Sequence, residues 1–171
     1  MRSIALWPTV IVLLIAVSSD LKYRRIPNLL VFPFLIFGVV TSVWVAGSQG
    51  LWLSFEGIGT GALIFGGLFC MQGMGMGDVK LCAAIGAWIG PGQLFVAIVL
   101  TGIAGGVMAV CWAIGGGFLP ELVTGAGDIL FGLRRRKLRP HPDLVMSNPR
   151  ARKMPYAPAI AIGTLISFFP R

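Results

Sequence analysis

Two aspartates, Asp20 and Asp78, are the residues of this chain best placed to do chemistry. Each lies where a long apolar segment meets a short basic one, and the 171 residues include only six acidic side chains. Two carboxyl groups held close together cannot both ionise easily, so such a pair shares one proton. A shared-proton pair can deprotonate a water molecule and protonate a leaving amine, which is the chemistry of aspartic proteases.

Each aspartate also has a purely structural interpretation. Asp20 could pair with Arg24, four residues later, if the helix continues that far. Asp78 could cap the helix that it begins, because the positive end of the helix dipole favours an acidic residue. What favours the catalytic interpretation is that the membrane topology derived below places both carboxyl groups at one depth.

The chain offers few other residues that could carry out catalysis or bind a metal. His141 is the single histidine and lies in a proline-rich polar stretch, so we do not expect a Ser-His-Asp triad. The three cysteines, Cys70, Cys82 and Cys111, stand in apolar sequence without a CxxC pair, which predicts buried free thiols. We therefore expect no metal site. The glycine-rich run before Asp78 lacks the Gly-Lys-Ser/Thr ending of a phosphate-binding loop.

The composition indicates a membrane protein. Hydrophobic residues make up 56% of the chain and charged residues only 12%, whereas soluble domains contain about 25% charged residues. Six apolar segments come near the about 20 residues that a membrane-spanning helix needs. They are residues 3–19, 29–46, 52–71, 78–90, 93–115 and 156–170. We expect an all-α, polytopic membrane protein with about six transmembrane helices, forming a single domain over residues 1–171.

The positive charges predict the orientation of these helices. The inside segments, with the N-terminus placed outside, are residues 20–28, 72–80 and 116–155. They hold every Lys and Arg of the chain except Arg2 and Arg171, as the positive-inside rule requires. This topology places Asp20 and Asp78 together at the cytoplasmic face.

The cytoplasmic loop of about 116–155 is the most basic part of the chain. Within it, residues 121–133 have apolar side chains at helical spacing and predict an amphipathic helix at the membrane surface. The basic run 134–139 that follows fits an attraction to anionic lipid. No nucleic-acid-reading module is recognisable, so we expect the lipid bilayer and no nucleic acid as a partner.

Three short motifs resemble those of a known family, the type IV prepilin peptidases. Residues 75–81 (GMGDVKL) are similar to the family's GxGDxKL signature. Asp20, followed by residues 25–28 (RIPN), resembles its other signature, and residues 154–161 (MPYAPAIA) resemble its C-terminal proline element. The three matches occur in the family's order and span most of the chain.

The resemblance implies an aspartic endopeptidase of the bacterial cytoplasmic membrane that uses no cofactor and no metal. Family members remove the short basic leader of prepilins at the cytoplasmic face. By this match, Asp20 and Asp78 are the catalytic pair, and the substrate is a prepilin whose apolar helix enters among the spans.

The resemblance also implies supporting roles for the remaining motif residues: Pro27, Asn28, Gly75, Gly77 and Lys80. The two glycines would let the backbone bend and approach the substrate. Pro27 would end one helix, and Asn28 would cap the next. The role of Lys80 does not follow from its position, because residues two apart do not share a helix face.

One departure from the family pattern concerns a second activity. Longer members carry an N-terminal extension with paired cysteines that is associated with N-methylation, and this chain has no CxxC, so we expect no methyltransferase activity. The compact form resembles the peptidases of tight-adherence (Flp-type) pilus systems. Two other functions stay open, a small ion- or proton-coupled transporter and a non-catalytic subunit of a membrane assembly machine.

Overall fold

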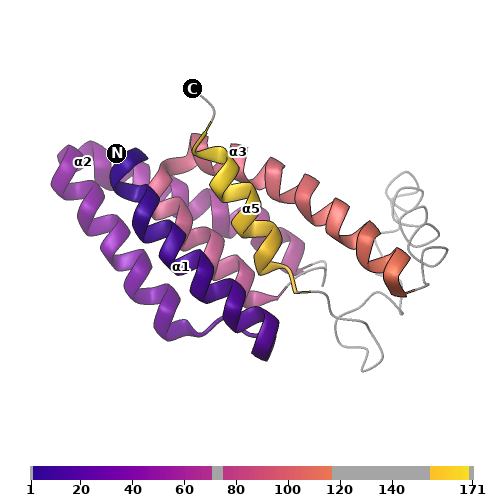
Figure 1. The fold of residues 1–171 in the computed structure, drawn as a ribbon. Coiled ribbons are helices and arrows are strands. Elements are labelled where there is room, and N and C mark those ends of the chain that lie inside the picture. Colours follow the sequence, from indigo (N-terminus) through magenta and orange to yellow (C-terminus); the bar gives the residue numbers. More distant parts are fainter. Residues whose placement is uncertain (1, 71–74, 117–154, 170–171) are drawn as a thin grey trace.

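A computed structural model describes residues 2–70, 75–116 and 155–169, and in these ranges the regular structure is entirely helical (Figure 1). The helices are α1 (Arg2–Tyr23), α2 (Asn28–Cys70), α3 (Met76–Gly116) and α5 (Ala157–Ser167). The first three are long and apolar enough to cross a membrane, and α5 is a shorter apolar helix. The all-α prediction is therefore confirmed for the described ranges. The amphipathic helix predicted over 121–133, like most of the basic loop, lies outside them.

Two glycines divide α2 and α3 into shorter helical segments. Gly47 (φ 58°, ψ −136°) interrupts α2, and Gly90 (φ 72°, ψ 174°) interrupts α3. Both φ angles are positive, a conformation that glycine adopts without steric cost. The breaks fall where the sequence separates the predicted segments 29–46 and 52–71, and 78–90 and 93–115. The first half of α2 is thus residues 28–46 and its second half is 48–70.

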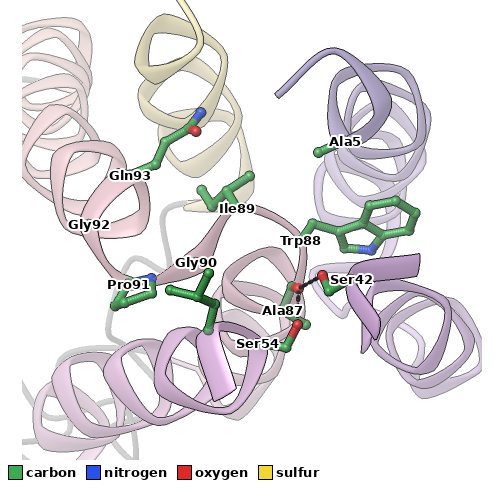
Figure 2. Close-up of a pocket in the computed structure, with 11 residues that line it drawn as sticks. Ala5, Ser42, Ser54, Ala87, Trp88, Ile89, Gly90, Pro91, Gly92 and Gln93 are labelled. Carbon is green, nitrogen blue, oxygen red and sulfur yellow. Dashed lines mark hydrogen bonds between the residues drawn. The ribbon is translucent and has the colours of Figure 1, made fainter. Parts of the chain in front are cut away.

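The break at Gly47 folds α2 back on itself. The hydroxyls of Ser42 and Ser54 both donate to the carbonyl of Ala87, over 3.2 and 2.8 Å (Figure 2). In a straight helix these two serines would stand about 18 Å apart. The fold at Gly47 brings them together. The carbonyl of Ala87 is free to accept both bonds because the residue four positions later is Pro91, which has no N–H to donate.

The first half of α3, residues 76–89, is the buried centre of the described structure. Apart from the half-buried Lys80, every side chain from Asp78 to Trp88 is buried. The second half of α2 runs antiparallel along it, so closely that a Cβ added at Gly57 or at Gly86 would strike the carbonyl group of the other. The first half of α2 runs parallel to it and is joined to it by a hydrogen bond from Trp88 Nε1 to the carbonyl of Phe34 (2.8 Å).

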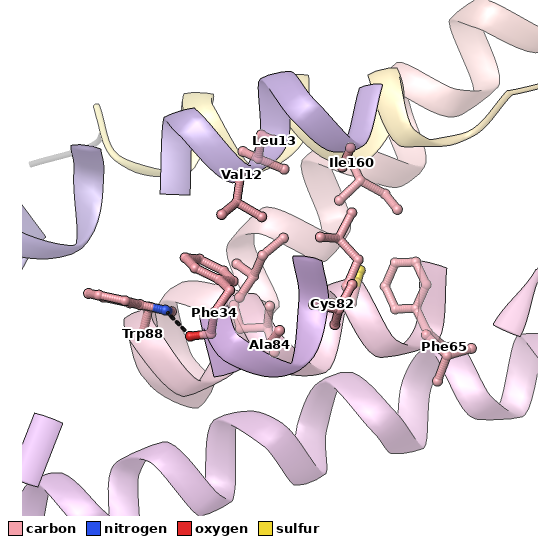
Figure 3. Packing of buried hydrophobic residues seen from close by; sticks show 14 of the residues in the cluster. Val12, Leu13, Phe34, Phe65, Cys82, Ala84, Trp88 and Ile160 are labelled. Carbon is pink, nitrogen blue, oxygen red and sulfur yellow. Dashed lines mark hydrogen bonds between the residues drawn. The ribbon is translucent and has the colours of Figure 1, made fainter. Parts of the chain in front are cut away.

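One hydrophobic core joins all the described helices (Figure 3). It includes Leu13 from α1, Phe34 and Phe65 from the two halves of α2, Trp88 from α3 and Ile160 from α5. The rings of Phe34 and Trp88 stack with their centroids 5.3 Å apart. Helix α5 lies antiparallel to the second half of α3, residues 91–116.

The outer surface of the bundle is apolar as well. Large hydrophobic side chains are exposed on every described helix, and among them Leu29, Trp44 and Phe169 are each more than four-fifths exposed. A water-soluble protein does not expose contiguous apolar surface on this scale. The exposed side chains and the three long apolar helices therefore fit a protein embedded in lipid.

The contact between Gly57 and Gly86 gives a prediction about stability. Replacing Gly86 with Ala forces the two helix backbones apart, and we expect a loss of about 1–3 kcal/mol in unfolding free energy, typical of overpacking. Gly59→Ala is the matched control, because nothing lies within 4 Å of a Cβ at that position of α2. Unfolding in mixed detergent and SDS micelles, followed by circular dichroism, measures both. Equal stability of the two variants would show that the glycine contact is unimportant.

Candidate active site

Asp20 lies in the last turn of α1, which continues beyond the predicted end at residue 19. The helix ends after Tyr23, where Arg24 takes a positive φ angle of 52° and donates its N–H to the carbonyl of Asp20 (2.8 Å). Asp20 is only 8% exposed. Its Oδ2 accepts a hydrogen bond from the N–H of Ala157 (3.0 Å), at the start of α5. Asp20 has no ion pair within the described ranges, so the alternative of a bridge to Arg24 is not supported.

Asp78 lies in the first turn of α3 and is also buried, at 9% exposure. Its N–H donates to the carbonyl of Gly75 (3.1 Å). The carboxyl groups of Asp78 and Asp20 are close enough for their charges to interact. Although 58 residues apart in sequence, the two aspartates are thus brought together. A position at the start of a helix suits a negative charge, and the backbone of Gly75 also interacts with the carboxyl of Asp78.

The two motif glycines pack closely beside Asp78. A Cβ at Gly77 would lie 3.3 Å from the Cβ of Ile26, and a Cβ at Gly75 would lie 3.4 Å from Oδ2 of Asp78. Gly77, in the first turn of α3, has no positive φ angle. It lets the start of α3 approach the loop that leads into α2. That the two glycines let the backbone bend and approach the substrate stays a prediction.

Lys80 has a partner that the sequence did not indicate. Its Nζ donates to Oδ1 of Asn28 over 3.1 Å, and it also lies 5.6 Å from the centre of the Phe32 ring. Asn28 is the first residue of α2, and it directly follows Pro27, whose carbonyl accepts the N–H of Leu30 (3.1 Å). The side-chain oxygen of Asn28 accepts from Lys80, and its predicted role as a helix cap stays a prediction. The hydrogen bond ties the start of α2 to the start of α3, two residues from Asp78. The helix-face rule considers only contacts within one helix, so it could not have found this partner.

Tyr156 and Ala157 also belong to the site, and we did not single them out from the sequence. Ala157 donates its N–H to Asp20, and the phenol of Tyr156 is close enough to Asp78 and Cys82 to interact electrostatically. The sequence signal that could have identified them is the C-terminal proline element, residues 154–161, because it contains both residues.

The remaining reactive residues are His141, which lies outside the described ranges, and the three cysteines, of which Cys82 lies one helical turn from Asp78. Cys82 is buried, whereas Cys70 and Cys111 are exposed on the bundle surface, so the prediction of burial is wrong for these two. Apolar sequence placed them on a surface that faces lipid rather than in the core. No cluster of three metal-ligating side chains occurs in the described part of the chain.

One cavity of the bundle lies at the end of α3's first half that is far from Asp78. A cavity of about 280 Å³ lies around the Gly90 break and is lined in part by Ser42, Ser54 and Gln93 (Figure 2). Trp88, on its wall, is ten residues from Asp78, about 15 Å along a helix. No carboxylate lines this cavity.

The bond between Lys80 and Asn28 gives a second prediction. Lys80→Met and Asn28→Ala should each lower the unfolding free energy, and the double variant should lose less than the sum, by about 0.5–1.5 kcal/mol. Lys22 is the matched control, because it also lies over an aromatic ring, that of Tyr23 at 5.2 Å, but makes no cross-helix hydrogen bond in the described structure. Lys22→Met should be additive with Asn28→Ala. If the effects of Lys80→Met and Asn28→Ala were also additive, the hydrogen bond between the two side chains would not stabilise the fold.

Comparison with known proteins shows to which family the chain belongs. The model of the type IV leader peptidase family matches residues 7–110, a range that includes both aspartates and Lys80. A prepilin leader peptidase/N-methyltransferase of Xanthomonas campestris pv. campestris is 30% identical over 106 residues, which are 58% of this chain and 37% of that protein. No solved structure matches the chain. The chain thus belongs to the type IV leader peptidase family.

Proposed function

We propose that this protein is an aspartic endopeptidase that removes the short basic leader of Flp-type prepilins at the cytoplasmic face of the membrane. The observation that carries the proposal is the pair of buried carboxyl groups, Asp20 from the end of α1 and Asp78 from the start of α3. Family membership supports prepilin processing. The name of the Xanthomonas relative also includes an N-methyltransferase, but the carboxyl pair supports only hydrolysis, and our proposal is restricted to it.

In this mechanism the two carboxyl groups share one proton and hold a water molecule between them. The ionised carboxylate takes a proton from the water as its oxygen attacks the scissile carbonyl carbon, which gives a tetrahedral intermediate. The protonated partner then donates its proton to the leaving amine as the C–N bond breaks. The hydrogen bond from Ala157 to Oδ2 of Asp20 fixes one carboxylate while the proton moves. Burial of both groups excludes bulk water and strengthens these interactions.

The topology proposed with this function has six spans. The breaks at Gly47 and Gly90 divide the described helices into six segments, namely α1, two halves of α2, two halves of α3, and α5. Four basic residues lie close in sequence to the aspartates, at the end of the bundle where α1 ends and α3 begins. They are Lys22, Arg24, Arg25 and Lys80. By the positive-inside rule this end is cytoplasmic, where the leader of a prepilin is found.

Substitution of each aspartate tests the mechanism. We expect Asp20→Asn and Asp78→Asn each to slow leader removal at least about 100-fold, because each loses a group that holds or moves a proton. Cleavage of a co-expressed Flp-type prepilin in membranes, followed by immunoblotting with matched enzyme levels, measures this. Glu56→Gln is the control, since Glu56 is an exposed carboxylate on the second half of α2. Near-normal cleavage by either Asp variant would overturn the two-aspartate mechanism.

Cysteine accessibility tests the topology. In a background without native cysteines, Ser48→Cys marks the turn after Gly47, and Lys22→Cys marks the exposed end of α1. A membrane-impermeant maleimide should label Ser48→Cys in spheroplasts with intact cytoplasmic membranes, but Lys22→Cys only after permeabilisation, because the two positions lie on opposite sides. The same labelling behaviour at both positions would contradict a six-span arrangement.

A further inference from the structure

The phenol of Tyr156 is a polar group beside the carboxyl pair that the mechanism above does not use. Its side chain is half-buried, at the point where the chain enters α5. The phenol oxygen has no hydrogen-bond partner among the described residues. Among the described residues, the fully buried side-chain atom that lacks a hydrogen-bond partner is Oγ1 of Thr9. The phenol oxygen of Tyr156 therefore keeps some exposure, and it can donate to a group that enters the site.

The ring of Tyr156 is held between the two halves of α3. On one side is Gly105: a Cβ there would stand 2.6 Å from the phenol oxygen, so only glycine leaves room for the hydroxyl. On the other side are Asp78 and Cys82, one helical turn apart and close enough to interact with the phenol. The next residue, Ala157, bonds Asp20. One dipeptide therefore approaches both carboxyl groups, through its backbone on one side and its phenol on the other.

Peptide hydrolysis needs a hydrogen-bond donor that neither carboxyl group supplies. As water adds to the scissile carbonyl, negative charge develops on the carbonyl oxygen, and preorganised donors aimed at that oxygen stabilise the transition state. A phenol with an ordinary pKa near 10 stays protonated at neutral pH and can donate throughout the reaction. The N–H of Ala157, which bonds one member of the pair, is already committed to Asp20.

We propose that the Tyr156 hydroxyl donates a hydrogen bond to the carbonyl oxygen of the scissile peptide bond and to the tetrahedral intermediate that forms from it. This inference rests on the proposed peptidase function. No bond to Tyr156 forms or breaks, and its proton stays on the phenol oxygen. Gly105 holds the donor in place by leaving space for it.

The test is the removal of one oxygen atom. Tyr156→Phe keeps the ring and its packing, and we expect kcat for prepilin cleavage to fall about 100-fold, the size of effect found when one oxyanion donor is removed, with KM and the unfolding midpoint nearly unchanged. Tyr23→Phe is the matched control, because Tyr23 is the other tyrosine and is 65% exposed at the end of α1. Cleavage by Tyr156→Phe at the wild-type rate would overturn the proposal and leave Tyr156 as a packing residue.

A second pair of variants moves the phenol without removing it. Gly105→Ala should lower kcat because the new methyl group displaces the hydroxyl, whereas Gly106→Ala should not, since nothing lies within 4 Å of a Cβ there. In a Tyr156→Phe background, Gly105→Ala should cause little further loss. An equal loss in both backgrounds would overturn the proposal, because the glycine would then act independently of the hydroxyl.

The same assay separates this inference from the function on which it rests. Wild-type protein, Asp20→Asn and Asp78→Asn are measured beside the tyrosine and glycine variants. If the wild type does not cleave, the peptidase function fails, and the role of Tyr156 fails with it. If the wild type cleaves, both Asp variants do not, and Tyr156→Phe is unaffected, only the role of Tyr156 is rejected.

Discussion

The arrangement of this protein depends on the close approach of two helix backbones at Gly57 and Gly86. No side chain fits between them, so the second half of α2 lies directly against the first half of α3. This contact helps to bury the first half of α3 along its length, and Asp78 at its start is carried into the interior with it. The same packing places the carbonyl of Ala87, which Pro91 leaves without a helical partner, beside the hydroxyls of Ser42 and Ser54. The two hydroxyls thus supply the donor that Pro91 removes.

The candidate active site is assembled from ends of helices rather than from their middles. Asp20 closes α1, Asp78 opens α3, and Tyr156 and Ala157 precede or open α5. Helix ends have backbone donors without intrahelical partners, and one of these, the N–H of Ala157, bonds a carboxylate. The site thus uses backbone groups that have no partner within their own helix, so no helical hydrogen bond is lost. A conduction pathway would instead require ionisable groups along the interior of the spans, and the two aspartates lie at one end.

Much of this architecture could be predicted from the sequence, because its causes are local. Apolar segments of sufficient length define the helices, and the glycine breaks at Gly47 and Gly90 fall between predicted segments. Counting helices that alternate in direction placed Asp20 and Asp78 at one membrane depth, but it did not predict that the two carboxyl groups interact. The bond between Lys80 and Asn28 could not be found in this way, because it joins residues 52 apart and depends on how two helices are rotated. The contact of Ala157 with Asp20 depends on the packing of α5, which a list of segments does not give. The exposed cysteines show a related limit, since apolar sequence in such a protein belongs equally to the core and to the lipid-facing surface.

The hydrogen bond from Ala157 to Asp20 has a consequence for the biogenesis of the protein. It joins residues 137 positions apart, so during synthesis α1, α2 and α3 are made well before the donor emerges from the ribosome. Until then the carboxylate of Asp20 lacks its backbone partner and the site is open on the side that α5 covers. The candidate site is therefore completed only after the last described helix has been inserted, and a partly translated chain does not yet hold both carboxyl groups in their final surroundings.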